Sequence, residues 1–462
     1  MNKDASQDAK DLQSALNEPR KTLGLSDAIA LIVGIVVGAG IFRTPSLVAA
    51  NSADETIFFS VWILGGLISL IGALCYAELS TAFPNTGGDY HFIYRAYGQN
   101  MGFLFAWARM TVIQTGSIAL LAFIFGDYMA EVYSPFSYSS IIYAALAVVI
   151  LTAINIIGVQ FGSGTQKLLT SLEVFGVLFV IVAGLFFSDT NIQDTHSPGA
   201  PSTSNSFGMA MVIVLLTFGG WNEAAYISSE MKAGGTQIVR ALITGLIAIT
   251  FIYLLVNFAY MNTLGLDAMS KSGAVGTDVM KASFGTPGVM ILAGIVALSA
   301  LTSANATIFT GARTNYALGR DFRSFGQLGR WNYKNSTPVT AFLVQALISL
   351  ALISMGFFTR SGFETIVQYT APVFWFFFLL VGIALFLLRI KEPGQVRPFK
   401  VPLYPLTPVV FCLTSCYLLY SSIVYTGIGA FVGIVVLLSG LIVNFALSRN
   451  SKNRKKHIES PA

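Results

Sequence analysis

Long apolar stretches, separated by short polar segments, run along almost the whole chain. A helix needs about 20 consecutive apolar residues to cross the hydrocarbon core of a bilayer, and twelve windows meet this requirement. They cover residues 27–49, 56–83, 99–130, 138–158, 165–188, 206–230, 238–263, 288–318, 338–358, 363–390, 403–422 and 425–447. The pattern predicts an all-α polytopic membrane protein with twelve transmembrane helices.

Composition supports this prediction, because 54% of the 462 residues are hydrophobic and only 11% are charged. A soluble domain carries about 25% charged residues. Lys and Arg orient the spans, since positively charged loops face the cytoplasm. With twelve spans, 22 of the 27 lysines and arginines lie on one side, four lie on the other and Arg109 lies inside a span. We therefore expect a multi-pass protein of the cell membrane with both termini in the cytoplasm and no cleavable signal in residues 1–22.

The chain offers little of the chemistry that other membrane protein classes need. It has no G-x-x-x-x-G-K-[ST] loop and no polar segment long enough for an ATP-hydrolysing domain. The three histidines are scattered, and Cys75, Cys412 and Cys416 all lie in predicted spans. We therefore expect no metal, no cofactor, no catalytic site and no nucleic-acid partner. A secondary transporter is the favoured class, and a channel or a membrane-embedded enzyme is the alternative.

Two predicted spans contain glycine pairs at a similar depth. The first span has Gly38 and Gly40 on either side of Ala39, and the sixth has Gly219 next to Gly220. Glycine lowers helix stability by about 1 kcal/mol relative to alanine, and broken helices at matching places in two halves are typical of transporter binding sites. The alternative is helix packing, but packing glycines repeat every four residues. We therefore predict that both helices are unwound there, in two five-helix halves of opposite orientation.

Five blocks resemble, in the right order, segments of the amino acid–polyamine–organocation (APC) superfamily, and especially its L-type amino acid permeases. They are VVGAGIFRTP (36–45), ALCYAELSTAFPNTGGDYHFIYRAYG (73–98), FGGWNEAAYISSEMK (218–232), ALSALTSANATIFTGARTNYALGRD (297–321) and LLRIKEPGQVRPFKVPLYPLTPVV (387–410). The resemblance implies a five-plus-five inverted repeat, with helices 1 and 6 unwound and two additional helices. It divides the chain into a cytoplasmic tail (1–22), a first repeat (23–200), a second repeat (201–392), helices 11 and 12 (393–448) and a second cytoplasmic tail (449–462).

The resemblance also implies where an amino acid binds. Free N–H groups at the first break hold the substrate carboxylate, because a helix N-terminus favours an anion, and carbonyls at both breaks meet the ammonium group. The matching positions are Gly38, Ala39, Gly40 and Ile41 for the carboxylate, and Val36, Leu216, Thr217 and Gly219 for the ammonium group. Leu216 stands where L-type members carry an aromatic gate, and Phe218 is a further candidate for a gate.

Charged residues at membrane depth are functional candidates. Arg109 in the third span and Glu173 in the fifth lie at similar depth, so an ion pair between them is one interpretation. Glu223 is either a carboxylate for the side chain of a cationic substrate or an acid solvated by the vestibule. We favour neutral amino acids as substrates, with Glu223 and Arg109 as possible side-chain or gate residues.

Helix 5 departs from the family pattern T-x-x-K, because Glu173 replaces the lysine. In the family that lysine stands in for a sodium ion near helices 1 and 8. A glutamate in apolar surroundings holds its proton more tightly than one in water. The alternative is a sodium site shared with Ser299, Thr302 and Ser303, since oxygen ligands suit hard cations. We predict cation coupling at Glu173, with a proton favoured over sodium; obligatory exchange is the account if neither ion is coupled.

Five further charged residues, predicted near cytoplasmic helix ends, are candidates for a cytoplasmic gate of ion pairs. They are Glu78, Arg95, Glu230, Arg320 and Asp321. The predicted external loops contain no cysteine, so no disulfide-linked subunit is expected, and Arg43 on that side has no assigned role. The sequence thus predicts a secondary active transporter for neutral L-amino acids. The alternatives are a cationic amino acid or polyamine carrier or exchanger, a sodium-coupled symporter, and an amino acid sensor that does not transport.

Overall fold

The structure is a computed structural model that describes residues 21–42, 44–187, 204–232, 235–332, 334, 337–354, 362–426, 431 and 434–445. Arg43 and most of the two predicted tails lie outside the described residues. Within the described ranges the regular secondary structure is helical, apart from two isolated β-bridges, and turns and irregular segments connect the helices. The all-α fold class is therefore confirmed.

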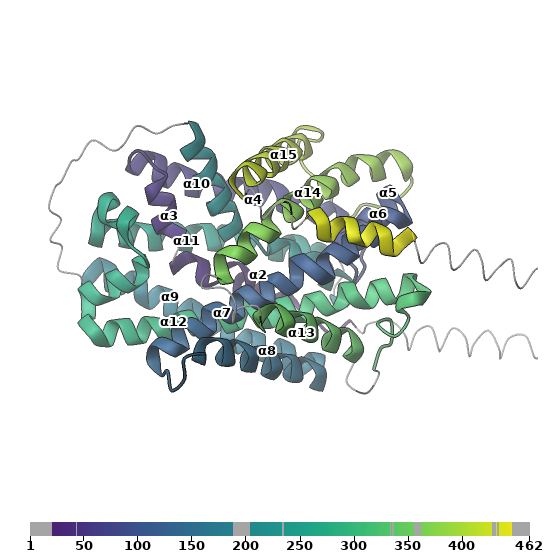
Figure 1. The fold of residues 1–462 in the computed structure, drawn as a ribbon. Coiled ribbons are helices and arrows are strands. Elements are labelled where there is room, and N and C mark those ends of the chain that lie inside the picture. The colour runs from purple at the N-terminus through teal and green to yellow at the C-terminus, as the bar shows by residue number, and fades with distance from the viewer. Residues whose placement is uncertain are drawn as a thin grey trace, which may run out of the picture.

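Fourteen α-helices and four short 3₁₀ or π segments have named bounds (Figure 1). In chain order these are α2 (Leu25–Val36), η1 (Ala39–Phe42, 3₁₀), α3 (Thr44–Ala50), α4 (Glu55–Ala82), α5 (Asp89–Tyr97), α6 (Gln99–Ala108), η2 (Arg109–Ile113, π), α7 (Gln114–Val132), α8 (Ser139–Ile157), α9 (Val159–Phe186), α10 (Ser204–Thr217), η3 (Trp221–Glu230, 3₁₀), α11 (Gly235–Lys271), α12 (Val275–Asp321), η4 (Arg323–Phe325, 3₁₀), α13 (Val339–Ser354), α14 (Gly362–Lys391) and α15 (Leu406–Thr426).

Ten helical stretches in the described part of the chain are long and apolar enough to cross a membrane. They coincide with the first eight, the tenth and the eleventh of the predicted windows. The ninth and twelfth windows contain shorter apolar helices, Val339–Ser354 and Ile434–Phe445. The chain is thus a multi-pass membrane protein, while the count of twelve stays a prediction.

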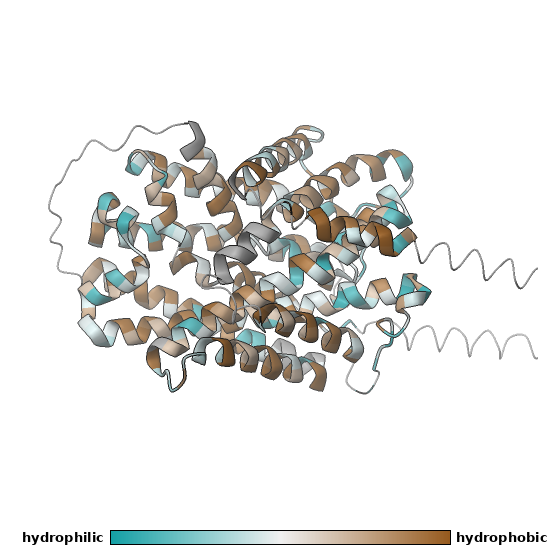
Figure 2. Ribbon diagram, in the orientation of Figure 1, coloured by the Kyte–Doolittle hydropathy of each residue, from teal (hydrophilic) through white to brown (hydrophobic). Residues whose placement is uncertain are grey.

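The outer surface is apolar and the interior holds charges, the reverse of a protein in water. Figure 2 shows hydrophobic residues along α8 and α13 at the edge of the bundle. On α8, Leu146, Val149 and Ile150 are each about half exposed. Lipid tails solvate such side chains, whereas unpaired charges are costly in lipid. Charged side chains such as Glu173 and Arg313 are accordingly enclosed by the bundle.

Helix α2 lies in the middle of the bundle (Figure 1) and packs against α9, α11 and α12. Gly34 permits the approach of α9 and α12, because a Cβ there would come within 2.3 Å of Thr170 Oγ1 and 2.7 Å of Thr302 Cγ2. The short α2 is thereby held between helices from both halves of the chain. Its C-terminal end consequently lies deep inside the protein.

A two-residue β-bridge joins the segment before α2 to the end of η3. Leu23 N–H donates to the Glu230 carbonyl at 3.0 Å, and Lys232 N–H donates to the Leu23 carbonyl at 2.9 Å. The first and sixth predicted spans therefore contact each other at this end, about 200 residues apart in sequence.

Candidate functional site

The first predicted break is present in the structure. Helix α2 ends at Val36, and Val37 has non-helical angles (φ −72°, ψ 36°). The chain continues as the 3₁₀ turn η1 and becomes α-helical again at Thr44. Within the described residues, the N–H groups of Gly38 and Gly40 donate no backbone hydrogen bond outside this local turn. Neither N–H group is thus bonded to the backbone of another described segment.

The second predicted break is present as well. Helix α10 ends at Thr217, Gly219 N–H donates to the Leu216 carbonyl at 3.0 Å, and the chain resumes as the 3₁₀ segment η3. Gly220 adopts φ +110°, a conformation that side chains with a Cβ rarely take. A glycine is thus needed where the helix stops.

The two breaks lie side by side. Thr217 Oγ1, directly before the second break, donates at 3.0 Å to Thr44 Oγ1, directly after the first. A Cβ on Gly220 would come within 2.2 Å of Ile35 Cγ2 on the last turn of α2. A Cβ on Gly40 would be 3.4 Å from Thr217 Cγ2. The glycines therefore both interrupt the helices and allow them to meet.

Tyr253 on α11 connects the breaks, and nothing in the sequence pattern marks it. Its buried hydroxyl contacts the carbonyl oxygen of Val36 at the end of α2 and that of Thr217 at the end of α10, the latter at 3.2 Å. A phenol has one proton to donate, so it satisfies one of the two carbonyls at a time. The other is left for a second donor. Both carbonyls were predicted to meet the substrate ammonium group.

Replacing Tyr253 with Phe is expected to raise the KM for substrate about tenfold with little change in the maximal rate. The loss leaves a buried carbonyl without its donor, which costs about 1–3 kcal/mol, and loosens both breaks. The measurement is the concentration dependence of uptake into proteoliposomes. Tyr260→Phe, on the same helix, is the matched control, and equal KM values for both variants would contradict the role of Tyr253.

Phe218 and Leu216 lie differently from each other. The ring of Phe218 is fully buried and packs between Tyr253 and Trp62, with ring centroids 4.9 and 6.3 Å away. Leu216 is only partly buried. Phe218 therefore supports the second break through its packing against Tyr253 and Trp62.

Glu173 on α9 contacts α12 and the end of α2. Its side chain is fully buried, Ser299 Oγ contacts its Oε1, and its Oε2 has no hydrogen-bond partner among the described residues. The same Ser299 hydroxyl lies 3.1 Å from the Val37 carbonyl, at the first break. Ser303 donates to the Gly34 carbonyl at 2.8 Å. The structure thus brings Glu173, Ser299 and Ser303 together around the last turn of α2.

Thr302 takes a more peripheral place in this group. Its hydroxyl donates to the Leu298 carbonyl of its own helix at 2.8 Å, and its methyl group faces Gly34. Its oxygen retains a lone pair for a cation. Of the three hydroxyl residues predicted beside Glu173, Ser299 alone contacts the carboxylate in the described part of the chain.

Arg109 pairs with Glu223, so its alternative pairing with Glu173 is wrong. Both Glu223 oxygens accept from Arg109 Nη2, at 2.7 and 2.8 Å, and both side chains are buried. Arg109 begins the π-helical turn η2, a feature that is frequent at functional sites. Its guanidinium lies over the ring of Tyr226, 3.9 Å from the centroid. Glu223 is therefore neither solvated nor a free carboxylate.

A family model described as "Amino acid permease" matches residues 23–447. The chain belongs to this family, within the APC superfamily. The predicted resemblance is therefore confirmed, and the permease is a transport protein and not an enzyme.

Three relatives illustrate where the permease stands in this family. The serine/threonine exchanger SteT of Bacillus subtilis (strain 168) is 29% identical over 94% of this chain and 98% of its own length. The b(0,+)-type amino acid transporter 1 of Mus musculus is 28% identical over 92% and 88%. The large neutral amino acids transporter small subunit 2 of Mus musculus is 27% identical over 92% and 81%. All three are amino acid transporters by name.

The permease forms ion pairs around the helix ends where a cytoplasmic gate was predicted. Glu78 is buried and accepts from Arg389 at 2.6 and 2.8 Å and from Val401 N–H at 2.7 Å. Arg95 pairs with Glu392 at 2.6 Å, in a more exposed place. These contacts join α4 and α5 to the end of α14 and the segment that follows it, so two of the predicted gate residues have partners that the sequence did not indicate.

The other gate candidates differ in burial. Glu230 pairs with Arg313 on α12 inside the protein, at 2.9 Å for the Nη2 contact. Asp321 accepts from the Tyr90 hydroxyl at 2.5 Å, whereas Arg320 is exposed. Glu230 and Arg313 thus form the most enclosed ion pair of this group.

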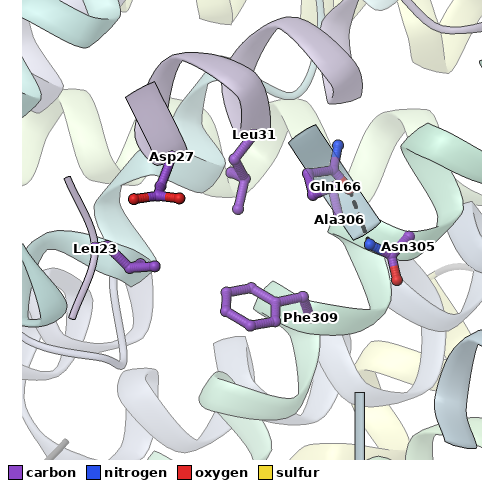
Figure 3. A pocket seen from close by; sticks show the side chains of 7 residues that line it. All are labelled: Leu23, Asp27, Leu31, Gln166, Asn305, Ala306 and Phe309. Atoms are coloured by element: carbon purple, nitrogen blue, oxygen red, sulfur yellow. Dashed lines mark hydrogen bonds between the residues drawn. The ribbon is translucent and has the colours of Figure 1, made fainter. Parts of the chain in front are cut away.

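A small pocket lies between the start of α2, α9 and α12 (Figure 3). Its lining consists of Leu23, Asp27, Leu31, Gln166, Asn305, Ala306 and Phe309. Asn305 Nδ2 donates to Gln166 Oε1 at 3.0 Å, and Asp27 pairs with Lys167 at 2.7 Å. The same three helices hold Glu173 about two turns further along α9, so the pocket approaches Glu173 from one end.

Proposed function

We propose that this permease is a secondary active transporter that carries neutral L-amino acids across the cell membrane by alternating access. The observation that carries the proposal is the pair of adjacent helix breaks. The N–H groups of Gly38 and Gly40 suit a carboxylate, and the carbonyls of Val36 and Thr217 suit an ammonium group. An α-amino acid presents both groups on one carbon.

We propose the layout of the fold in the same terms. Residues 23–200 and 201–392 form the two inverted repeats, residues 393–448 form helices 11 and 12, and both tails are cytoplasmic. The matching lengths of α2 (12 residues) and α10 (14 residues) before their breaks support this division. So does the contact between the two breaks.

The favoured substrates are neutral because the permease already neutralises the carboxylate nearest the second break. A carrier for cationic side chains needs an unpaired acid, and Glu223 is bound by Arg109. The names of two relatives, a serine/threonine exchanger and a large neutral amino acid transporter, also support neutral substrates. Cationic amino acids are the second candidate, given the b(0,+)-type relative.

Counterflow of labelled amino acids in proteoliposomes tests transport and substrate class together. We expect exchange of labelled serine, threonine or leucine, and thermal stabilisation of the purified protein by the same compounds. Stabilisation by arginine or putrescine alone would overturn the neutral-substrate proposal. Stabilisation without counterflow would indicate a sensor.

The contacts of Glu173 favour a proton as the coupled ion. Ser299 Oγ has one proton but lies within reach of two acceptors, Glu173 Oε1 and the Val37 carbonyl. Both contacts are hydrogen bonds at once only when the carboxyl group carries a proton and donates it to Ser299. Loss of that proton places a charge beside the first break. We propose that protonation of Glu173 is linked in this way to the substrate site.

Replacing Glu173 with Gln is expected to abolish the response of uptake to an imposed pH gradient while counterflow continues. Glutamine keeps the shape and a donor but cannot exchange a proton. The measurement is uptake driven by a pH gradient or by a sodium gradient, in wild type and in Glu173→Gln, with Ser171→Ala on the same helix as the control. If wild type and Glu173→Gln respond identically to both gradients, Glu173 is not the coupling residue and exchange is the better account.

A further inference from the structure

A second buried acid lies beside the Arg109–Glu223 pair, and neither the substrate site nor the ion site uses it. Asp89 is the first residue of α5, between two of the long spans, and is 3% exposed. Asn222 Nδ2 on η3 lies 3.4 Å from Asp89 Oδ2. Two carboxyl groups, from α5 and η3, thus share the surroundings of one guanidinium from η2.

The hydrogen bonds of this cluster are incomplete. Asp89 Oδ1, Asn222 Oδ1 and Arg109 Nε are all buried, and none has a hydrogen-bond partner within the described ranges. Two of these three atoms are acceptors. A buried acceptor without a donor is costly, and a proton on Asp89 Oδ1 turns one of these two acceptors into a donor.

The charge count leads to the same result. Arg109 is neutralised by Glu223, which it contacts through both oxygens. An ionised Asp89 would therefore be a surplus negative charge inside the protein, and such a group tends to neutralise by taking up a proton. The cluster is electrically balanced only when Asp89 is protonated.

The pKa of Asp89 agrees with this count. Burial above all, and the neighbouring Glu223, raise it from its usual 3.8 to about 7, against the lowering effects of Arg109, Tyr226 and Asn222. The hydroxyl of Tyr76 on α4 also faces Asp89.

The other charged groups near α5 are engaged elsewhere. On α5 itself, Arg95 pairs with Glu392. On α14, Lys391 donates to the Ala96 carbonyl and Arg389 pairs with Glu78. Arg109 is thus the positive charge that bears on Asp89 in the described part of the chain.

We propose that Asp89, Arg109 and Glu223 form a proton-binding site, separate from Glu173, in which Asp89 holds the proton while η3 is packed against α5. The inference rests on the proposed transport function, because it links the site to alternating access. Movement of η3 away from α5 would admit water to Asp89. The carboxyl group then loses its proton to that water, and its affinity for a proton returns to that of an ordinary aspartate in water.

The sign of the pH effect follows from this difference in proton affinity. Between about pH 4 and pH 7 the packed arrangement binds a proton that the hydrated one does not, so it loses stability as the pH rises. Above about pH 7 Asp89 is ionised in both arrangements and the effect levels off. Low pH therefore holds η3 against α5 and slows the movement by which η3 opens away from it.

The test is counterflow in proteoliposomes with equal pH inside and outside, from about pH 5.5 to 7.5. Wild type is expected to exchange roughly thirtyfold faster at the upper end, since the ratio of hydrated to packed protein rises about tenfold per pH unit over the roughly 1.5 units between pH 5.5 and pH 7. Asp89→Asn, which is neutral throughout, is expected to remain slow and independent of pH. Asp267→Asn, which breaks an exposed ion pair with Lys271, is the matched control and is expected to keep the wild-type profile.

Infrared spectroscopy of the purified protein reads the proton directly. Wild type should show the C=O band of a protonated carboxyl group that disappears near pH 7, and Asp89→Asn should lack it. In Glu223→Gln the freed Arg109 favours ionised Asp89, so the band should disappear at a lower pH. Both proteins carry Glu173→Gln in this measurement, which removes the band of that second buried carboxyl group. A band titrating near pH 7 that persists when Asp89→Asn is added, or no such band while Asp89 is present, overturns the proposal. If wild type shows the band but exchanges no amino acid at any pH, the transport function fails and the proton site stands.

Discussion

Replacing Gly220 with alanine is expected to reduce amino acid transport about a hundredfold. Gly220 has φ +110°, and the left-handed conformation costs a residue with a Cβ roughly 1–2 kcal/mol. The new Cβ would also come within 2.2 Å of Ile35 Cγ2, and overpacking of this kind costs about 1–3 kcal/mol. Relief of the clash pushes the end of α2 away from η3. The two breaks then no longer face each other, and each 1.4 kcal/mol lost is about tenfold in affinity.

Gly98→Ala separates the two causes. Gly98 has φ +91°, but among the described residues nothing lies within 4 Å of the position that a Cβ would take. This variant therefore bears the backbone strain without the clash. Uptake and substrate-induced thermal stabilisation should fall far less in Gly98→Ala than in Gly220→Ala. Similar losses in both variants would mean that backbone strain alone is responsible, and that the contact between Gly220 and α2 does not hold the site.

Removing one partner of the Arg313–Glu230 pair is expected to be the most destabilising change in the permease. Arg313 is fully buried, donates to both Glu230 oxygens and to the Phe309 carbonyl, and lies over the Phe309 ring. Glu230→Gln leaves that guanidinium buried without its counter-charge. Breaking a buried pair in this way costs about 3–5 kcal/mol. The measurement is the melting temperature and the folded yield in detergent.

The exposed pair between Arg95 and Glu392 is the matched control, because it has the same two residue types and the same two-oxygen geometry. Exposed pairs contribute about 0–1 kcal/mol, so Glu392→Gln should change the melting temperature little. Glu230→Gln combined with Arg313→Met should recover part of the loss, since no uncompensated charge remains. Equal effects of Glu392→Gln and Glu230→Gln would contradict the role of burial.

The helix breaks could be predicted from the sequence because the residues themselves cause them. Gly38, Gly40, Gly219 and Gly220 weaken the helix wherever they lie, so no knowledge of neighbours is needed. The place of Glu173 beside Ser299 followed from the family resemblance, which fixes the fifth and eighth predicted spans (α9 and α12) relative to each other. The structure places these residues together in the same way.

Residues whose part depends on a distant contact could not be found in this way. Tyr253 is one of 18 tyrosines, and its contacts exist only because α11 passes both breaks. Asp89 lies in the polar segment NTGGDY, which looks like a solvated loop until α5 folds against η3. Arg109 was placed with Glu173 by depth alone, but the 3₁₀ winding of η3 turns Glu223 toward it. Charge and depth fix a residue's height in the membrane and not the direction in which it faces.

The β-bridge at Leu23 has a mechanical consequence. It fastens the entry to α2 to the exit of η3, while Ile35 against Gly220 fastens their opposite ends. Because α2 and η3 are joined at both ends, they move as one rigid unit. A substrate gripped by either broken helix would therefore pull on the other, and any rocking that spares the bridge has to carry α2 and η3 together. Its two hydrogen bonds contribute only about 1 kcal/mol each. The bridge is therefore weak enough to break and let α2 and η3 separate when the opposite ends of the two segments are under load.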